Sequence, residues 1–242
     1  MGLKTIISEF ATKCFSRNKV LRGPFAGLAY PAKSIGSAYC PKLVGTYELE
    51  LHAIINSWKS HPPRTVLNIG GAEGYYAVGL AKIFPDCRVV TYEADSYGRT
   101  LIQAMAELNT VSGNIKIKGL CQPENLEHEL EKHPKSLIIM DVEGAEDELL
   151  PANPSIFSET ELLVEIHDEL CPGVGGRLIE RFNSSHIITQ YDPAPRKTDV
   201  FKAAELKPFS WLPRFIQLKI LDEKRGYNYW LHMAPQINES KN

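Results

Sequence analysis

The sequence lacks the features that mark several large classes of protein. Its five cysteines are far apart and include no C-x-x-C pair, which argues against a structural zinc site and a disulfide framework. A reducing, cytoplasmic location is therefore expected. No apolar run approaches the roughly 18 residues of a transmembrane helix, and Glu9, Lys13 and Arg17 interrupt any secretory signal core.

The chain also lacks a strong net charge. A formal charge of −2 over 242 residues gives no reason to expect nucleic-acid binding. The charge is unevenly spread, because residues 66–170 carry 7 basic and 19 acidic side chains, whereas residues 1–65 carry 9 and 3 and residues 171–242 carry 11 and 7. An acidic centre favours a cationic ligand over a bare polyphosphate, although solvated acidic helix faces would give the same pattern.

The most informative stretch present is TVLNIGGAEG at 65–74, followed by YYAVGLAKIF. Residues 65–69 form a short β-branched and apolar run that predicts a buried strand, and residues 75–84 predict a helix. Gly70, Gly71 and Gly74 lie in the turn between them, where the missing Cβ atoms let the backbone approach a ligand. This order of elements is typical of the first unit of a nucleotide-binding sheet.

Strands and helices alternate through the rest of the chain. Strands are expected at 65–69, 88–93, 114–118, 136–141, 161–166, 186–191 and 229–233, and helices at 75–84, 96–109, 125–132, 145–150 and 175–182. This pattern predicts an α/β fold, a doubly wound, mostly parallel seven-stranded sheet. Ligands of such sheets lie at the carboxyl ends of the strands, so Asn68, Glu93, Asp141, Glu165 and His167 are candidate site residues.

Three segments lie outside the alternation. Residues 1–45 form an N-terminal extension, in which 3–22 could be a basic amphipathic helix that packs on the domain or contacts a membrane surface. Residues 46–58 predict a helix with Thr46 as its N-cap. Residues 192–228 are an insert between the last two strands of the 46–242 domain. We expect the extension and the insert to cover the site.

The glycine turn does not specify one nucleotide. It lacks the Gly-Lys-Ser/Thr of a Walker A loop, since Tyr75 follows Gly74, and Ala72 occupies the second glycine of the dinucleotide pattern G-x-G-x-x-G. Glu93 ends the second strand, where a carboxylate accepts hydrogen bonds from the two hydroxyls of a ribose. This feature fits both nicotinamide dinucleotides and S-adenosylmethionine.

Four segments resemble class I S-adenosylmethionine-dependent methyltransferases, and within them the FkbM-type O-methyltransferases. They are VLNIGGAEGYYAVGLA, the Glu of VVTYEAD, IIMDVEGAEDELL and LLVEIH. The resemblance covers about residues 45–170, and DVEGAE at 141–146 is its most specific part. Asn68 departs from the family, in which most members have Asp.

The resemblance implies the cofactor-binding residues. Gly70, Gly71, Ala72, Glu73 and Gly74 would surround the methionine part and the ribose, although a tight turn without a ligand or a solvent-facing Glu73 is also compatible. Asn68 would accept a hydrogen bond from the amino group, directly or through water. Glu93 would hold the ribose, Cys121 would lie near the adenine, and Tyr75 would close over the cofactor or pack in the core.

The catalytic candidates are His167, Asp141 and Glu143. Methyl transfer to a hydroxyl removes its proton, and a histidine oriented by a carboxylate suits that work. Asp141 could contact the cofactor or orient the acceptor, and Glu143 could share a helix face with Glu146. Glu146 and Asp147 are expected to favour the helix N-terminus. Asp141, His167 and Asp168 could instead bind Mg²⁺, but we favour the interpretation in which the protein has no metal site.

We therefore expect an O-methyltransferase for a hydroxyl of a sugar, glycan or small metabolite, the acceptor class being implied by the resemblance. No nucleic-acid partner and no transmembrane segment are expected, and a homo-oligomer is compatible with the sequence. Two alternatives stay open: a nicotinamide-dependent oxidoreductase, and a non-catalytic relative that serves as an interaction module, which the departure at Asn68 keeps open.

Overall fold

A computed structural model describes residues 2–30, 34–35, 37–151 and 154–236. Seven strands form one sheet: β1 (Thr65–Ile69), β2 (Arg88–Tyr92), β3 (Ile115–Lys118), β4 (Leu137–Met140), β5 (Glu161–Ile166), β6 (His186–Tyr191) and β7 (Tyr229–Pro235). Their order is β3-β2-β1-β4-β5-β7-β6. All pairings are parallel except those of β7, which runs antiparallel to both β5 and β6. The predicted doubly wound sheet is confirmed.

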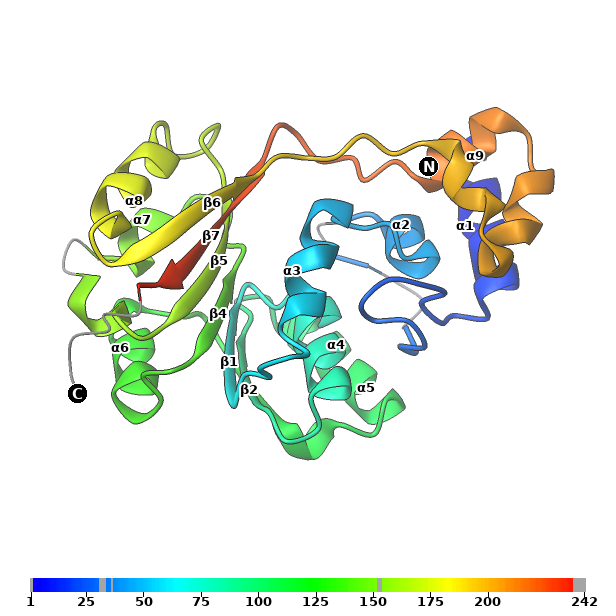
Figure 1. The fold of residues 1–242 in the computed structure, drawn as a ribbon. Helices are drawn as coiled ribbons and strands as arrows, with labels where there is room; N and C mark the ends of the chain where they lie inside the picture. The colour runs from blue at the N-terminus through cyan, green and yellow to red at the C-terminus, as the bar shows by residue number, and fades with distance from the viewer. Residues whose placement is uncertain (1, 31–33, 36, 152–153, 237–242) are drawn as a thin grey trace.

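Helices cover both faces of this sheet (Figure 1). One face carries α3 (His52–Ser57), α4 (Tyr75–Ile83) and α5 (Ser96–Leu108), and the other carries α6 (Pro123–Lys132), α7 (Glu146–Leu149) and α8 (Val174–Phe182). Alternate strand residues feed two separate cores, since Val66 and Ile139 pack in the first whereas Leu67 and Ile138 pack in the second. The near-continuous apolar strands of the sequence are therefore buried on both faces.

The chain order reverses between β1 and β4, because β2 and β3 lie on one side of β1 and the later strands lie on the other. Ligands of doubly wound sheets bind at this point, beyond the carboxyl ends of the strands. The residues that follow Ile69 and Met140 therefore lie at the edge where a site is expected.

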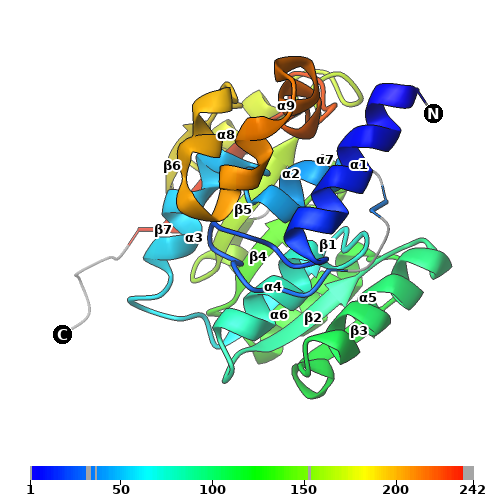
Figure 2. The ribbon, with the colours of Figure 1, turned by 90° about the vertical axis from the view of Figure 1, so that its right-hand side faces the viewer.

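The segments outside the sheet form a separate layer. The N-terminal extension contains α1 (Leu3–Ser16) and α2 (Tyr39–Val44), and the insert contains the 3-10 helices η4 (Thr198–Lys202) and η5 (Ala204–Trp211) and helix α9 (Arg214–Ile220). α1 packs against α9, so the extension and the insert meet (Figure 2). In the part of the chain that the structure describes, no helix has the length and apolar character needed to cross a membrane.

The helix predicted from Thr46 begins later than expected. Glu48 has a left-handed φ of 46°, and a 3-10 turn, η1 (Leu49–Leu51), leads into α3. The Thr46 hydroxyl is buried and makes no hydrogen bond with the described residues, so Thr46 does not cap the helix. Tertiary contacts explain the later start, because the Glu48 carboxylate accepts hydrogen bonds from Tyr76 and Arg225.

Candidate functional site

A cavity of about 460 Å³ lies at the carboxyl edge of β1, β2, β4 and β5. Its walls include the glycine turn, the polar residues after β4 and β5, and residues of both segments outside the sheet, among them Lys42 of the extension and Arg225 of the insert. The volume falls within the range of about 300–1,000 Å³ that small-molecule sites occupy. This cavity is the candidate active site.

Gly70 fixes the glycine turn against the neighbouring strands. Its φ is +82°, and a Cβ there would lie 1.7 Å from the carbonyl oxygen of Asp141. The amides of Gly70 and Gly71 both donate to the carbonyl of Tyr92, at 3.0 and 2.9 Å. Only glycine fits at position 70, because any side chain would collide with Asp141. The two hydrogen bonds to Tyr92 hold the turn at the end of β2, beside the end of β4.

Glu93 and Ala72 line the cavity beside this turn. The carboxylate of Glu93 accepts a hydrogen bond from the amide of Ala72 at 2.6 Å and another from the amide of Asp95 at 2.8 Å. Asp95 caps α5 through the amides of Tyr97 and Gly98. Glu93 is thus held in place from both sides, at the cavity edge where a ribose ligand was predicted.

Asn68 lines the cavity but uses its amide within the sheet. Its Oδ1 accepts from the Thr91 hydroxyl at 3.1 Å, and its Nδ2 donates to the carbonyl of Ile139 at 3.4 Å. An aspartate could not donate to that carbonyl. Asn68 therefore links β1 to both adjacent strands, which gives a structural reason for asparagine here.

Glu73 is completely buried and faces the N-terminal extension. Its carboxylate accepts hydrogen bonds from Lys42, Tyr30, the Ser34 hydroxyl at 3.0 Å and the amide of Ile35 at 3.0 Å. Burial raises the pKa of Glu73, but Lys42 outweighs this effect and the pKa lies below its ordinary value. Glu73 does not line the cavity, and its contacts attach the extension to the glycine turn.

Of the remaining predicted cofactor residues, one lines the cavity and two do not. Tyr75 lines it and also packs edge-to-face against Phe25 and Tyr47, so both of its predicted roles fit. Gly74 and Cys121 are not among the lining residues. Cys121 is buried in the second core, where burial raises the pKa of its thiol to about 12.

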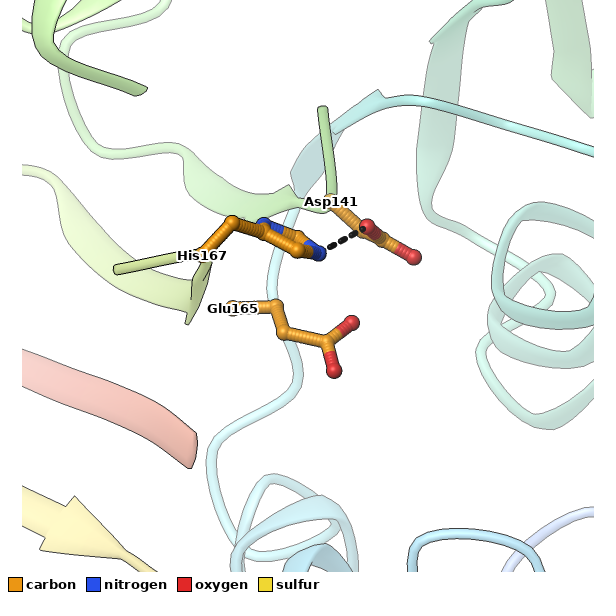
Figure 3. Close-up of side chains that lie close together, drawn as sticks. All are labelled: Asp141, Glu165 and His167. Atoms are coloured by element: carbon orange, nitrogen blue, oxygen red, sulfur yellow. Dashed lines mark ion pairs between the residues drawn. The ribbon is translucent and has the colours of Figure 1, made fainter. Parts of the chain in front are cut away.

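Three polar side chains converge where β4 and β5 end. Asp141, Glu165 and His167 offer ligand atoms that all lie within 4.8 Å of one another. In Figure 3 the His167 ring points toward the Asp141 carboxylate, and Glu165 lies on the same side. His167 Nε2 is 3.6 Å from Asp141 Oδ1 and 3.5 Å from Glu143 Oε2. Asp141 Oδ1 is buried and makes no hydrogen bond with the described residues.

Glu146 orients the histidine from the other side. Its Oε1 lies 2.6 Å from His167 Nδ1 and 3.1 Å from the amide of Gly144, and the residue is fully buried. Since the carboxylate accepts from Nδ1–H, the neutral ring carries its free lone pair on Nε2, which faces Asp141 and the cavity. From its place in the sequence, Glu146 was expected only to favour the helix N-terminus, and its contact with His167 was not predicted.

The charges of the cluster shift the proton affinities of its members. Burial lowers the pKa of His167, but the carboxylates of Glu146, Asp141 and Glu143 outweigh this effect and raise the pKa above its ordinary value. Burial and neighbouring carboxylates raise the pKa of both Asp141 and Glu165. The cluster therefore holds more protons near neutral pH than three isolated groups would.

The donor set compatible with a divalent cation differs from the predicted one. Asp168 turns away, because its carboxylate accepts from the Gly175 amide at 3.2 Å and the Tyr229 hydroxyl at 3.0 Å. Glu165 takes its place beside Asp141 and His167. Two carboxylates and one imidazole suit a transition metal at least as well as Mg²⁺.

Arg225 of the insert lines the cavity, a position that the sequence did not indicate. Its guanidinium pairs with Glu48 at 3.3 Å, with Glu50 and with Glu223 at 3.3 Å, and lies 3.6 Å from Glu165. Glu48 lies 177 residues away in sequence, so no local pattern could have revealed this network. It joins the insert to the segment before α3 at the cavity wall.

Comparisons with known proteins bear on the fold. No family model matches the sequence, and no curated protein is significantly similar to it. The structure resembles a precorrin-6y C5,15-methyltransferase from Geobacter metallireducens, with a TM-score of 0.51, 12% identity and coverage of 81% of this chain and 92% of that one.

It also resembles an O-methyltransferase from Bacillus cereus in complex with SAH, with a TM-score of 0.48, 14% identity and coverage of 74% and 77%. At such identities a likeness establishes architecture only. The chain has the Rossmann-like fold of the methyltransferases.

Proposed function

We propose that this protein is a class I S-adenosylmethionine-dependent O-methyltransferase of the FkbM type, which methylates a hydroxyl of a small molecule or glycan. The observation that carries the proposal is the cluster at the end of β5, where a buried Glu146 orients His167 so that Nε2 faces the cavity. The fold and the glycine turn support the choice of cofactor, and the resemblance of DVEGAE and LLVEIH to the FkbM-type O-methyltransferases implies the hydroxyl acceptor.

The cavity fits a cationic cofactor. Asp141 Oδ1 is buried there with no hydrogen bond from the described residues, and Glu93 and Glu143 add acidic side chains to the wall. Two of the basic groups of the wall are engaged already, since Lys42 pairs with Glu73 and Arg225 with several glutamates. The third, Lys224, is exposed and forms no ion pair with a carboxylate of the described residues. A ligand that brings positive charge to Asp141 would relieve the cost of this buried atom, which lacks a hydrogen bond from the described residues.

The residues that would hold S-adenosylmethionine are Glu93 at the ribose and the turn Gly70–Ala72 with Asn68 and Asp141 at the methionine part. When bound, the cofactor supplies a methyl group already activated on a sulfonium. The protein then has to align the acceptor, exclude water and accept one proton.

His167 accepts that proton. In its neutral form Nε2 takes the proton of the acceptor hydroxyl, and the positive charge that results on the ring is stabilised by Glu146 at 2.6 Å and by Asp141 at 3.6 Å. The proton leaves to solvent through Glu143, whose side chain is 69% exposed and lies 3.5 Å from Nε2. Glu146 is a positioning residue, because it acts through His167.

The test is transfer of a labelled methyl group from S-adenosylmethionine to a panel of sugars and hydroxylated metabolites. We expect His167→Gln to lower kcat by about 10²–10⁴-fold with little change in cofactor affinity. His128→Gln, on the exposed side of α6, is the matched control and should keep full activity. Equal activity of the two variants would refute the role of His167.

A metal-dependent mechanism would use two of the same residues, Asp141 and His167, together with Glu165, and a separate experiment tests it. The protein is treated with EDTA, dialysed and assayed again with and without added Mg²⁺ or Mn²⁺. Proton acceptance by His167 predicts unchanged turnover after EDTA. Loss of turnover that Mn²⁺ or Mg²⁺ restores would instead assign Asp141, Glu165 and His167 to a metal ion.

A further inference from the structure

Helix α1 is built with its large apolar side chains on the outside. Leu3, Ile6, Ile7 and Phe10 are all exposed, Leu3 to 71% and Phe10 to 69%. At 3.6 residues per turn these positions share one face of the helix. The opposite face, which packs on the protein, is formed by Ser8, Ala11, Thr12 and Ser16. A helix of a globular protein normally buries its apolar face, so this reversed pattern points to a second surface that covers α1.

Helix α9 and the end of η5 continue the exposed apolar surface. Trp211 is 77% exposed, and Phe215 and Leu218 are about half exposed. These elements pack against α1 (Figures 1 and 2): Phe15 meets Phe209 edge-to-face at 5.1 Å, and Lys4 Nζ lies 5.5 Å from the Phe215 ring. We call seven of the exposed apolar side chains of these elements the α1–α9 surface: Leu3, Ile6, Ile7, Phe10, Trp211, Phe215 and Leu218. Phe15, which is 38% exposed, packs against Phe209 and is not included.

The surroundings of the α1–α9 surface are basic. Residues 1–22 carry five basic and one acidic side chain, and residues 197–219 carry five and two. Lys4, Arg17, Lys207 and Arg214 are exposed, and none forms an ion pair with a carboxylate of the described residues. The acidic block of the chain lies elsewhere, in residues 66–170. Apolar side chains surrounded by unpaired cations are complementary to a surface that is apolar inside and anionic at its edge.

We propose that the α1–α9 surface docks the protein onto an anionic phospholipid bilayer, with α1 and α9 lying in the interface. Exposed Trp, Phe and Leu side chains with flanking Lys and Arg are the composition of interfacial helices, and tryptophan favours the headgroup level. A second copy of the chain fits less well, because a two-fold contact brings the two basic surrounds together. The proposal does not depend on the catalytic assignment, since none of the seven residues lines the cavity.

Trp211 provides an intrinsic probe. The other two tryptophans, Trp58 and Trp230, are 5% and 0% exposed, so Trp211 is the one whose emission responds to a change of solvent. Vesicles of 70% phosphatidylcholine and 30% phosphatidylserine are added to the full chain in 100 mM NaCl. We expect a blue shift of the emission and co-sedimentation of the protein with these vesicles, and about tenfold weaker binding to phosphatidylcholine alone.

Two variants with matched controls test the apolar and the basic parts. Phe10→Ser should weaken binding at least tenfold, whereas Leu108→Ser, at an exposed leucine on α5, should not. Arg214→Gln should weaken binding about fivefold, whereas Lys132→Gln on α6 should not. Circular dichroism and S-adenosylmethionine binding of each variant show that the fold and the cavity are intact.

Three results would overturn the proposal. They are the absence of vesicle binding by the wild type, equal weakening by a variant and its control, and a wild-type dimer that Phe10→Ser dissociates without any vesicle binding. The last result, measured by analytical ultracentrifugation, would assign the α1–α9 surface to contact between copies. Failure of methyl transfer with intact vesicle binding would refute the proposed function alone.

Discussion

The buried pair of Lys42 and Glu73 offers the sharpest test of how the site is held together. Lys42 is 3% exposed and Glu73 is fully buried, and the pair joins α2 of the extension to the glycine turn. Glu73→Gln keeps one acceptor oxygen, for Tyr30 and the Ser34 hydroxyl, but it replaces the oxygen that accepts from the Ile35 amide and removes the charge. The change leaves the Lys42 ammonium in the interior without a counter-ion.

The expected loss in the free energy of unfolding depends on the contacts that the Lys42 ammonium keeps. Removing one partner of a buried ion pair costs about 3–5 kcal/mol. The ammonium keeps a hydrogen bond to the Ser37 hydroxyl at 2.6 Å and lies over the rings of Tyr47 and Tyr75, at 4.8 and 5.2 Å from their centroids. These contacts offset part of the loss, so we expect a destabilisation of about 3 kcal/mol.

Urea unfolding at pH 7, followed by circular dichroism, measures this loss. The matched control is Glu159→Gln, because Glu159 and Lys135 form an ion pair at 3.5 Å with side chains that are 54% and 80% exposed. That surface pair should contribute less than about 1 kcal/mol. Replacing both buried partners, with Lys42→Met and Glu73→Gln, should recover much of the lost stability.

The same pair predicts a dependence of stability on pH. The pKa of Glu73 is lower in the folded protein than its ordinary value. The stabilisation by Glu73 is therefore complete above the unfolded pKa and is lost as the pH falls through the folded pKa. Glu73→Gln should flatten the acid side of the stability profile. The reasoning would be refuted if Glu73→Gln cost no more than Glu159→Gln.

Three further predictions concern the cavity. Because the pKa of His167 is raised, kcat should rise with pH through a midpoint above 6.5. Glu146→Gln should move that midpoint to lower pH, and an unchanged midpoint would exclude His167 as the base. Gly70→Ala places a Cβ 1.7 Å from a carbonyl oxygen and should lower the free energy of unfolding in urea by at least about 2 kcal/mol. In the control Gly113→Ala the Cβ meets nothing within 4 Å, and the free energy of unfolding should change by less than about 0.5 kcal/mol. Glu93→Ala should weaken S-adenosylmethionine binding about 10–100-fold by calorimetry, and wild-type affinity would remove Glu93 from the ribose site.

The sheet could be predicted from the sequence because its signals are local. The runs TVLNI, RVVTY and ELLVEI carry apolar residues on both faces and are bounded by turn residues. The strands and alternating helices lie within two residues of their expected positions. The glycine turn was recognisable for the same reason, since Gly70 occupies a backbone position that excludes a side chain.

The contacts that build the site were not predictable in the same way, because they depend on tertiary distances. Glu146 and His167 are 21 residues apart and Lys42 and Glu73 are 31 apart, and no periodicity relates either pair. Thr46 carried an N-cap signal, yet Glu48 turns toward Tyr76 and Arg225 and the helix begins after it. In α1 the pattern predicted an amphipathic helix, but the structure was needed to show that the apolar face points outward.

Calorimetric titration of the full chain with S-adenosylmethionine tests the proposed cofactor. We expect saturable binding of one cofactor per chain, weakened by Glu93→Ala and unchanged by His128→Gln, and no competing binding of NADH. The absence of saturable heat at millimolar S-adenosylmethionine, or binding of NADH in its place, would contradict this expectation.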